Sequence, residues 1–136
     1  DDATFAKIKD QFKAGCLSED EILTTIKTCF NETGYLLDTH TAIGYGVLKQ
    51  YQQETGDHTK TVLLSTASPY KFPESVYQAI YGEELDVYTA IDKLSEKTGV
   101  PVPQALAGIK EREVLHKEAI DKTEIISFIK SEIEAM

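Results

Sequence analysis

Apolar residues at helical spacing predict a first helix over Thr4–Ala14. Phe5, Ile8 and Phe12 recur at intervals of three and four residues, which places them on one face of that helix. The glycine that follows, Gly15, is the expected left-handed end of the element.

A second helix begins at Ser18, with the clearest local signal in the sequence. Ser18 and Glu21 have the spacing of a capping box, in which each side chain bonds the backbone amide of the other. The apolar stripe that follows ends at Gly34 and consists of Ile22, Ile26, Cys29 and Phe30. We therefore interpret Cys29 as a small core residue.

The middle of the chain has the pattern of a strand, a helix and a second strand. Tyr35–Leu37 and Val62–Ser65 are apolar runs without alternation, as in strands that are buried on both faces of a parallel sheet. The helix between them carries an apolar stripe from Ile43 to Tyr51 and ends at Gly56. These elements predict one right-handed βαβ unit.

Two bounded helices follow the second predicted strand. Pro73 suits the first turn of a helix that ends at Gly82. Asp86 is the expected N-cap of the next helix, which ends at Gly99.

The signals beyond residue 100 are weaker. A turn of helix is expected from Pro103, and the run Val114–His116 is open between an edge strand and a loop. Asp121 and Glu124 have capping spacing and begin a last helix, whose apolar side consists of Ile125, Ile129 and Ile133.

Together these elements predict an α/β chain that is rich in helix, with one βαβ unit and its short parallel sheet flanked by helices. We divide it into two leading helices (residues 1–34), the βαβ unit with its loop (35–82) and a C-terminal helical segment (83–136). A two-stranded parallel sheet is not stable alone. Its other strands are therefore expected from a longer parent chain or from a partner copy.

Composition narrows the class of function. The 136 residues contain 14 Lys+Arg against 23 Asp+Glu, a net charge of −9, which argues against nucleic acid and anionic membranes as partners. No apolar run approaches the roughly 20 residues of a membrane helix. Two cysteines are too few for a disulfide scaffold and favour a reducing, cytoplasmic location. The histidines and cysteines lack the close spacing of a zinc site, so no metal is expected.

Polar clusters follow both predicted strands. Asp38–Thr41 comes after the first strand and Ser65–Ser68 after the second, with Lys71 three residues further on. The carboxyl ends of parallel strands meet at one edge of a sheet, where ligands bind, so we expect the two clusters side by side. Neutral hydroxyls with one lysine suit a phosphate or a heteroaromatic nitrogen better than a metal. For the first cluster, an N-cap at Thr39 or Thr41 and close packing at Gly44 and Gly46 are an alternative to ligand contact.

Both clusters resemble motifs of one known family. Residues 66–72, Thr-Ala-Ser-Pro-Tyr-Lys-Phe, resemble the C-terminal cofactor loop of threonine synthase, a pyridoxal-phosphate enzyme of the fold-type II class shared with tryptophan synthase β. Residues 38–44, Asp-Thr-His-Thr-Ala-Ile-Gly, resemble that family's Asp-Pro-His-Thr-Ala-Val-Gly stretch, at the right distance upstream. The resemblance covers most of the 136 residues, but only the last part of the family's usual chain.

The resemblance implies a reaction, a cofactor and a set of site residues. The family converts O-phosphohomoserine and water to threonine and phosphate with pyridoxal 5'-phosphate (PLP). Thr66 matches the threonine that hydrogen-bonds the pyridine nitrogen of PLP, and Ser65 beside it is the other residue expected to bind the cofactor. On the substrate or phosphate side, the resemblance implies Ser68, Lys71, His40 and Thr41.

The chain also departs from the family pattern. Ser68 stands where many members have His, and Thr39 where they have Pro. The Schiff-base lysine and the Gly-rich phosphate loop belong to the earlier part of such a chain. We therefore expect a C-terminal fragment that is inactive and free of PLP on its own and that depends on the missing N-terminal part. The alternative is a non-catalytic module that binds a small anion or a partner through a βαβ unit.

Self-association is a further expectation. A fragment of a larger fold exposes apolar faces and sheet edges, which drive association. We expect a two-fold homodimer that buries Val62–Leu64 or the face formed by Ile125, Ile129 and Ile133. A stable monomer, with helices folded over the short sheet, is the alternative.

Overall fold

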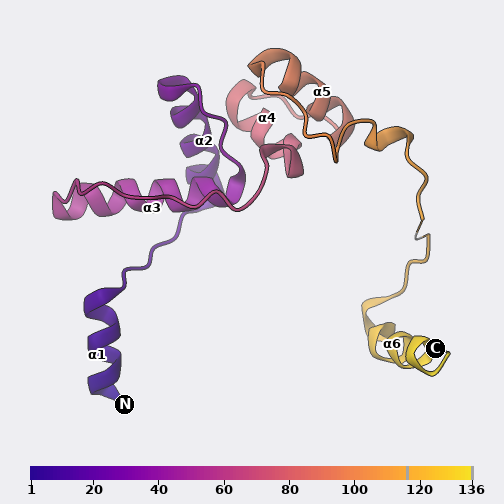
Figure 1. Cartoon of the computed structure of the whole chain (residues 1–136), viewed down its shortest axis with the longest axis horizontal. Coiled ribbons are helices and arrows are strands. Elements are labelled where there is room, and N and C mark those ends of the chain that lie inside the picture. Colours follow the sequence, from indigo (N-terminus) through magenta and orange to yellow (C-terminus); the bar gives the residue numbers. More distant parts are fainter. Residues whose placement is uncertain (116, 136) are drawn as a thin grey trace.

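The computed structural model describes residues 1–115 and 117–135, and within them every regular element is helical. Helices α2 to α5 form the packed body, whereas α1 and α6 stand away from it on extended connections (Figure 1). The α-helices are α1 (Asp2–Gln11), α2 (Glu19–Thr33), α3 (Thr39–Thr55), α4 (Pro73–Tyr81), α5 (Val87–Thr98) and α6 (Ile125–Glu134). The short 3-10 helices are η1 (Pro69–Lys71), η2 (Ile109–Glu111) and η3 (Lys122–Glu124).

The predicted helix ends of the body are confirmed. Ser18 caps α2 through a complete capping box with Glu21, in which the Ser18 amide donates to the Glu21 carboxylate at 2.6 Å. Asp86 caps α5, as predicted. The glycines expected to end these helices adopt positive φ angles between 70° and 75°: Gly34, Gly56, Gly82 and Gly99.

The predicted end of α1 is wrong. The helix stops at Gln11, Phe12 is already extended, and Gly15 does not adopt a positive φ angle. Among the described residues the apolar stripe that predicted a longer helix stays exposed: Phe5 is 58%, Ile8 49% and Phe12 68% exposed. Short isolated helices are marginal in water, so the last predicted turn does not form.

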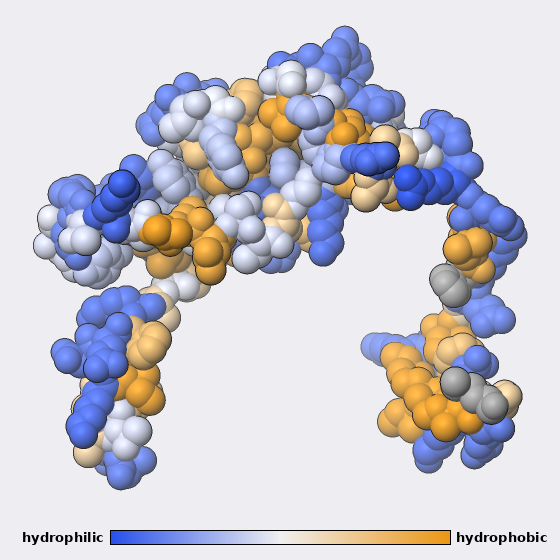
Figure 2. All heavy atoms as spheres, viewed as in Figure 1, coloured by the Kyte–Doolittle hydropathy of each residue, from blue (hydrophilic) through white to orange (hydrophobic). Residues whose placement is uncertain are grey.

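The core lies where α4 packs against both α2 and α5, and α3 also packs against α2. Figure 2 shows apolar patches among polar residues on the surface of this body, whereas α6 presents a broad apolar surface. The fully buried side chains include Ile26, Val76, Tyr77, Ala90 and Leu94. Cys29 belongs to this cluster, as predicted.

The predicted βαβ unit and its short parallel sheet are wrong, because the described residues contain no strand. Leu36 and Leu37 are buried, but in irregular chain between α2 and α3. Val62 and Leu64 are 83% and 76% exposed. A strand needs a neighbour that completes its hydrogen-bond ladder, and the described residues supply none.

The segment 57–66 nevertheless runs back along α3 toward its N-terminus (Figure 1). A Cβ built on Gly44 would lie 2.9 Å from Leu63 Cδ1, so this glycine admits the returning segment. A Cβ on Gly46 would lie 2.4 Å from Leu17 Cδ1 and 3.1 Å from Thr25 Oγ1, so this one admits the start of α2. Both contacts favour the packing interpretation of these glycines.

The C-terminal part is loosely attached. Val114 and Leu115 lie in irregular chain, and His116, the third residue of that predicted strand or loop, lies outside the described residues. Asp121 and Glu124 form the expected capping box, here on η3, which leads directly into α6. None of the described helices is long and apolar enough to span a bilayer.

Candidate functional site

The first predicted cluster lies at the N-terminus of α3, where Asp38 is the N-cap. The Asp38 carboxylate accepts hydrogen bonds from the backbone amides of His40 at 2.9 Å and Thr41 at 3.2 Å. It also accepts a short hydrogen bond from the Thr41 hydroxyl. Asp38 and Thr41 are both buried. Helix capping of this cluster is confirmed, but the expected N-cap residues, Thr39 and Thr41, are wrong: Asp38 is the N-cap, and the Thr41 hydroxyl bonds to it.

The second predicted cluster lies beside the first at the N-terminus of α3. Thr41 Oγ1 lies 3.4 Å from Ser65 Oγ, within hydrogen-bond distance, although the two residues are 24 apart in sequence. The expected adjacency of the two motifs is thus present, although the sheet that was expected to produce it is absent. The returning segment 57–66 and the packing of Leu63 at Gly44 produce it instead.

In the loop after Ser65, some polar side chains are exposed, whereas Ser68 is used in a helix cap. Thr66 is exposed, and its hydroxyl makes no hydrogen bond to another described residue. Ser68 caps η1, because its Oγ accepts from the Tyr70 amide at 3.2 Å. Lys71 is exposed, with Nζ 5.8 Å from the centroid of the Phe72 ring.

Phe72 also connects the two clusters. Its ring centroid lies 5.1 Å from that of His40, with the two planes inclined at 46°. His40 Nδ1 lies 3.6 Å from the Asp38 carboxylate, and the side chain remains 57% exposed. The structure thus brings together Thr41 with Ser65, and His40 with Phe72, while Thr66 and Lys71 remain exposed to solvent.

Asp38 is the site residue that sequence reasoning missed. Sequence analysis placed it in a polar cluster but gave it no role of its own. The available signal was the Asp-x-x-Thr pattern at a helix start, in which the Asp side chain can accept from both the backbone and the hydroxyl of Thr41. Burial of the carboxylate and its neighbour Ser65 are tertiary features, which that pattern does not contain.

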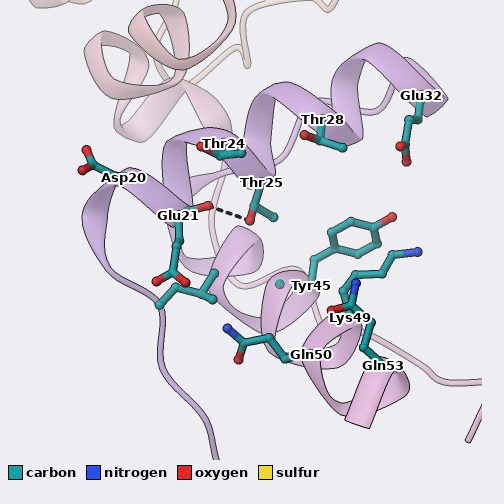
Figure 3. Close-up of a pocket in the computed structure, with 12 residues that line it drawn as sticks. Asp20, Glu21, Thr24, Thr25, Thr28, Glu32, Tyr45, Lys49, Gln50 and Gln53 are labelled. Atoms are coloured by element: carbon teal, nitrogen blue, oxygen red, sulfur yellow. Dashed lines mark hydrogen bonds between the residues drawn. The ribbon is translucent and has the colours of Figure 1, made fainter. Parts of the chain in front are cut away.

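A separate groove, away from the two polar clusters, lies between α2 and α3 (Figure 3). It encloses about 560 Å³ and is lined by hydroxyl, amide and carboxylate side chains, with Lys49 Nζ 5.2 Å from the Tyr45 ring centroid. Thr25 on its wall donates to the backbone carbonyl of Glu21 at 2.7 Å. None of the predicted site residues lines this groove, so its size alone does not make it the site.

Comparison with known proteins identifies a family. A family model described as threonine synthase, C-terminal, matches residues 41–129. Threonine synthase-like 1 of Mus musculus is 32% identical over 111 residues, which cover 79% of this chain and 14% of that protein. Threonine synthase of Haemophilus influenzae is 40% identical over 82 residues, covering 59% of this chain and 18% of that protein. No solved structure matches.

The family match covers more than half of the chain, and the chain therefore belongs to the threonine synthase family, in the C-terminal region of its members. This confirms the resemblance drawn from residues 38–44 and 66–72. The chain spans only 14% and 18% of the lengths of these two relatives.

Proposed function

We propose that this chain forms the C-terminal part of a PLP-dependent threonine synthase, a lyase that converts O-phosphohomoserine and water to threonine and phosphate. The observation that carries the proposal is the meeting of the two family motifs: the His40 and Phe72 rings lie 5.1 Å apart, and Thr41 contacts Ser65, the residue just before the second motif. Family membership supports the reaction class. The cytoplasmic location remains a prediction from composition.

The hydrogen-bond donors of this site suit the pyridine nitrogen of PLP. The pyridine nitrogen of PLP accepts a hydrogen bond from a neutral hydroxyl, and Thr66 offers one that the described residues leave unpaired. When bound, PLP supplies an electron sink for the substrate carbon skeleton. A threonine at the nitrogen leaves it largely unprotonated and so moderates that sink, in contrast to an aspartate. In this proposal Thr66 orients the ring, and Ser65 fixes the backbone before it.

The residues that the family resemblance places on the phosphate side differ in whether they can donate a proton to a phosphate oxygen. Thr41 donates its proton to Asp38, so it has no proton left to offer a phosphate oxygen. His40 and Lys71 are exposed and able to donate, and Ser68 retains its hydroxyl proton because its oxygen accepts from Tyr70. We therefore assign the substrate phosphate to His40, Lys71 and Ser68, with Thr41 as a structural neighbour.

We further propose that the 136 residues alone do not catalyse this reaction. None of their lysines lies in a Schiff-base motif, and the glycines are dispersed, mostly at helix ends, rather than gathered in a phosphate loop. Most of the affinity for PLP is therefore expected from residues outside this chain. Titration of the isolated chain with PLP should give no stoichiometric imine absorbance.

The test uses the full-length protein that carries this chain, loaded with PLP. Phosphate release from O-phosphohomoserine is expected, and Thr66→Val should lower kcat about tenfold or more, because a hydrogen bond of about 1–3 kcal/mol is lost. Thr61→Val is the matched control, since Thr61 is an exposed threonine of the same segment whose hydroxyl donates to the Thr59 carbonyl at 2.9 Å.

Two results would contradict the proposal. A wild-type protein that binds PLP but releases no phosphate from O-phosphohomoserine lacks the reaction. If Thr66→Val is as active as Thr61→Val, Thr66 does not hydrogen-bond the cofactor. Tight phosphate binding without turnover would instead favour the non-catalytic anion-binding module.

A further inference from the structure

The carboxylate of Asp38 is more deeply buried than a helix cap requires. Its side chain is fully buried, and it accepts hydrogen bonds from the His40 amide, the Thr41 amide and the Thr41 hydroxyl. A buried carboxylate is costly unless such bonds satisfy it. Its nearest cationic candidate is His40 at 3.6 Å, on an exposed side chain.

The same chain contains a matched cap without this burial. At the start of α5, Asp86 accepts from the Tyr88 amide at 3.1 Å, the Thr89 amide at 3.2 Å and the Thr89 hydroxyl at 2.5 Å. Asp86 is exposed, and the Thr89 hydroxyl contacts no further side chain among the described residues. Capping therefore explains the bonds that Asp86 and Asp38 share, but not the burial of Asp38 or the link beyond Thr41.

That link has a direction. A threonine hydroxyl has one proton, and the proton of Thr41 is held by the Asp38 carboxylate, which can only accept. The Thr41 hydroxyl is also the donor toward Ser65 Oγ, at 3.4 Å, and this longer contact is the weaker of the two. The Asp38 carboxylate, the Thr41 hydroxyl and the Ser65 hydroxyl thus form one continuous chain of contacts.

The register of the returning segment extends this effect to Thr66. Leu63 lies against α3 at Gly44, and Ser65 lies against it at Thr41. Every second residue of this part of the segment therefore faces α3. Side chains of an extended chain alternate between two sides. Because Leu63 and Ser65 face α3, Leu64 and Thr66 face away from it, although all four residues are exposed.

We infer that Asp38 is a positioning residue for the cofactor loop, acting through Thr41 and Ser65 to hold Thr66 toward the ligand. This inference rests on the proposed function, since it assigns Thr66 to PLP. Asp38 touches neither cofactor nor substrate in this account. It fixes the proton of one hydroxyl and, through it, the place where the returning segment ends on α3.

The decisive variant is Asp38→Asn, made in the full-length protein. Asparagine caps a helix as well as aspartate does, so the amides of His40 and Thr41 keep their acceptor. Its amide NH₂ group, however, can face Thr41 as a donor, which removes the acceptor that held the Thr41 proton. Thr41→Val removes the link outright, and Thr41→Ser restores it. Asp86→Asn and Thr89→Val are the matched controls on α5.

Two readouts separate positioning from capping. In hydrogen-exchange mass spectrometry of the peptide spanning residues 60–72, whose hydrogen-bonded amides are those of Tyr70, Lys71 and Phe72, Asp38→Asn and Thr41→Val should raise exchange about tenfold, equivalent to about 1.4 kcal/mol. Peptides within α3 should change by less than about twofold, as should both α5 controls. In phosphate-release kinetics, kcat should fall about tenfold with KM for O-phosphohomoserine nearly unchanged, and Thr41→Ser should recover most of it.

Each outcome decides one claim. Unchanged exchange at residues 60–72 in Asp38→Asn and Thr41→Val, in a protein that binds PLP normally, overturns the positioning role. Equal loosening by Asp86→Asn overturns it as well, because the effect would then be general destabilisation. A wild-type protein that binds no PLP overturns the proposed function, and with it the role assigned to Asp38.

Discussion

Gly46→Ala is expected to destabilise the body of the chain, although alanine is the better helix former. Gly46 is buried in α3, and a Cβ there would lie 2.4 Å from Leu17 Cδ1 and 3.1 Å from Thr25 Oγ1. Leu17 can rotate, but Thr25 is held by its hydrogen bond to the Glu21 carbonyl at 2.7 Å. The new methyl group therefore separates α3 from α2.

The magnitude follows from two opposing effects. Replacing glycine by alanine inside a helix gains about 1 kcal/mol. Overpacking a well-packed contact costs about 1–3 kcal/mol. The net expectation for Gly46→Ala is a loss of up to about 2 kcal/mol in the free energy of unfolding.

Gly44→Ala is the matched control, two residues away on the same helix. Its Cβ would meet only Leu63 Cδ1, at 2.9 Å, and Leu63 is 36% exposed and able to move. This variant should therefore be neutral or stabilised by up to about 1 kcal/mol. Urea unfolding of the 136-residue chain, followed by far-UV circular dichroism, measures both. Equal stability of the two variants would refute the packing argument.

Two further predictions concern the second helix and assembly. Ser18→Ala should cost about 1 kcal/mol in unfolding free energy. The Ser18 amide lowers the pKa of Glu21, so the stability that this bond adds is present above the ordinary carboxyl pKa of 4.5 and is lost as pH falls through the lowered value. Glu21→Gln, which removes the titrating carboxylate, should flatten that acid limb in urea titrations at several pH values, and an unchanged limb would contradict the assignment. The isolated chain should form dimers through Val62–Leu64 or the Ile125, Ile129 and Ile133 face, and light scattering that gives 15.1 kDa at high concentration would disprove this.

The local signals in the sequence predicted the helices of the body well. A capping box, an N-cap aspartate and a glycine at a positive φ angle act within one turn, so Ser18, Asp86 and Gly34 suffice to place helix ends. The end of α1 was mispredicted because its length was derived from an apolar stripe. Such a stripe stabilises a helix only when something packs against it, and Phe12 has no such partner.

Local signals of this kind could not decide whether the apolar runs form strands. An apolar run such as Val62–Leu64 has strand character, but a ladder forms only with a neighbour, and no described segment provides one. The adjacency of the two polar clusters was predicted from the edge of a parallel sheet that does not form, and the returning segment 57–66 brings the clusters together instead. The role of Asp38 was not predicted, since the sequence of its cap is like that of Asp86 and only burial distinguishes them.

The central claim is that Thr66 faces the pyridine nitrogen of PLP in the full-length protein, and a crystal structure of that protein with PLP bound tests it most directly. The account predicts that Thr66 Oγ1 lies at hydrogen-bond distance from that nitrogen, about 2.6–3.2 Å, with Ser65 still on Thr41. A different residue at the nitrogen, with Thr66 beyond about 4 Å, would contradict it.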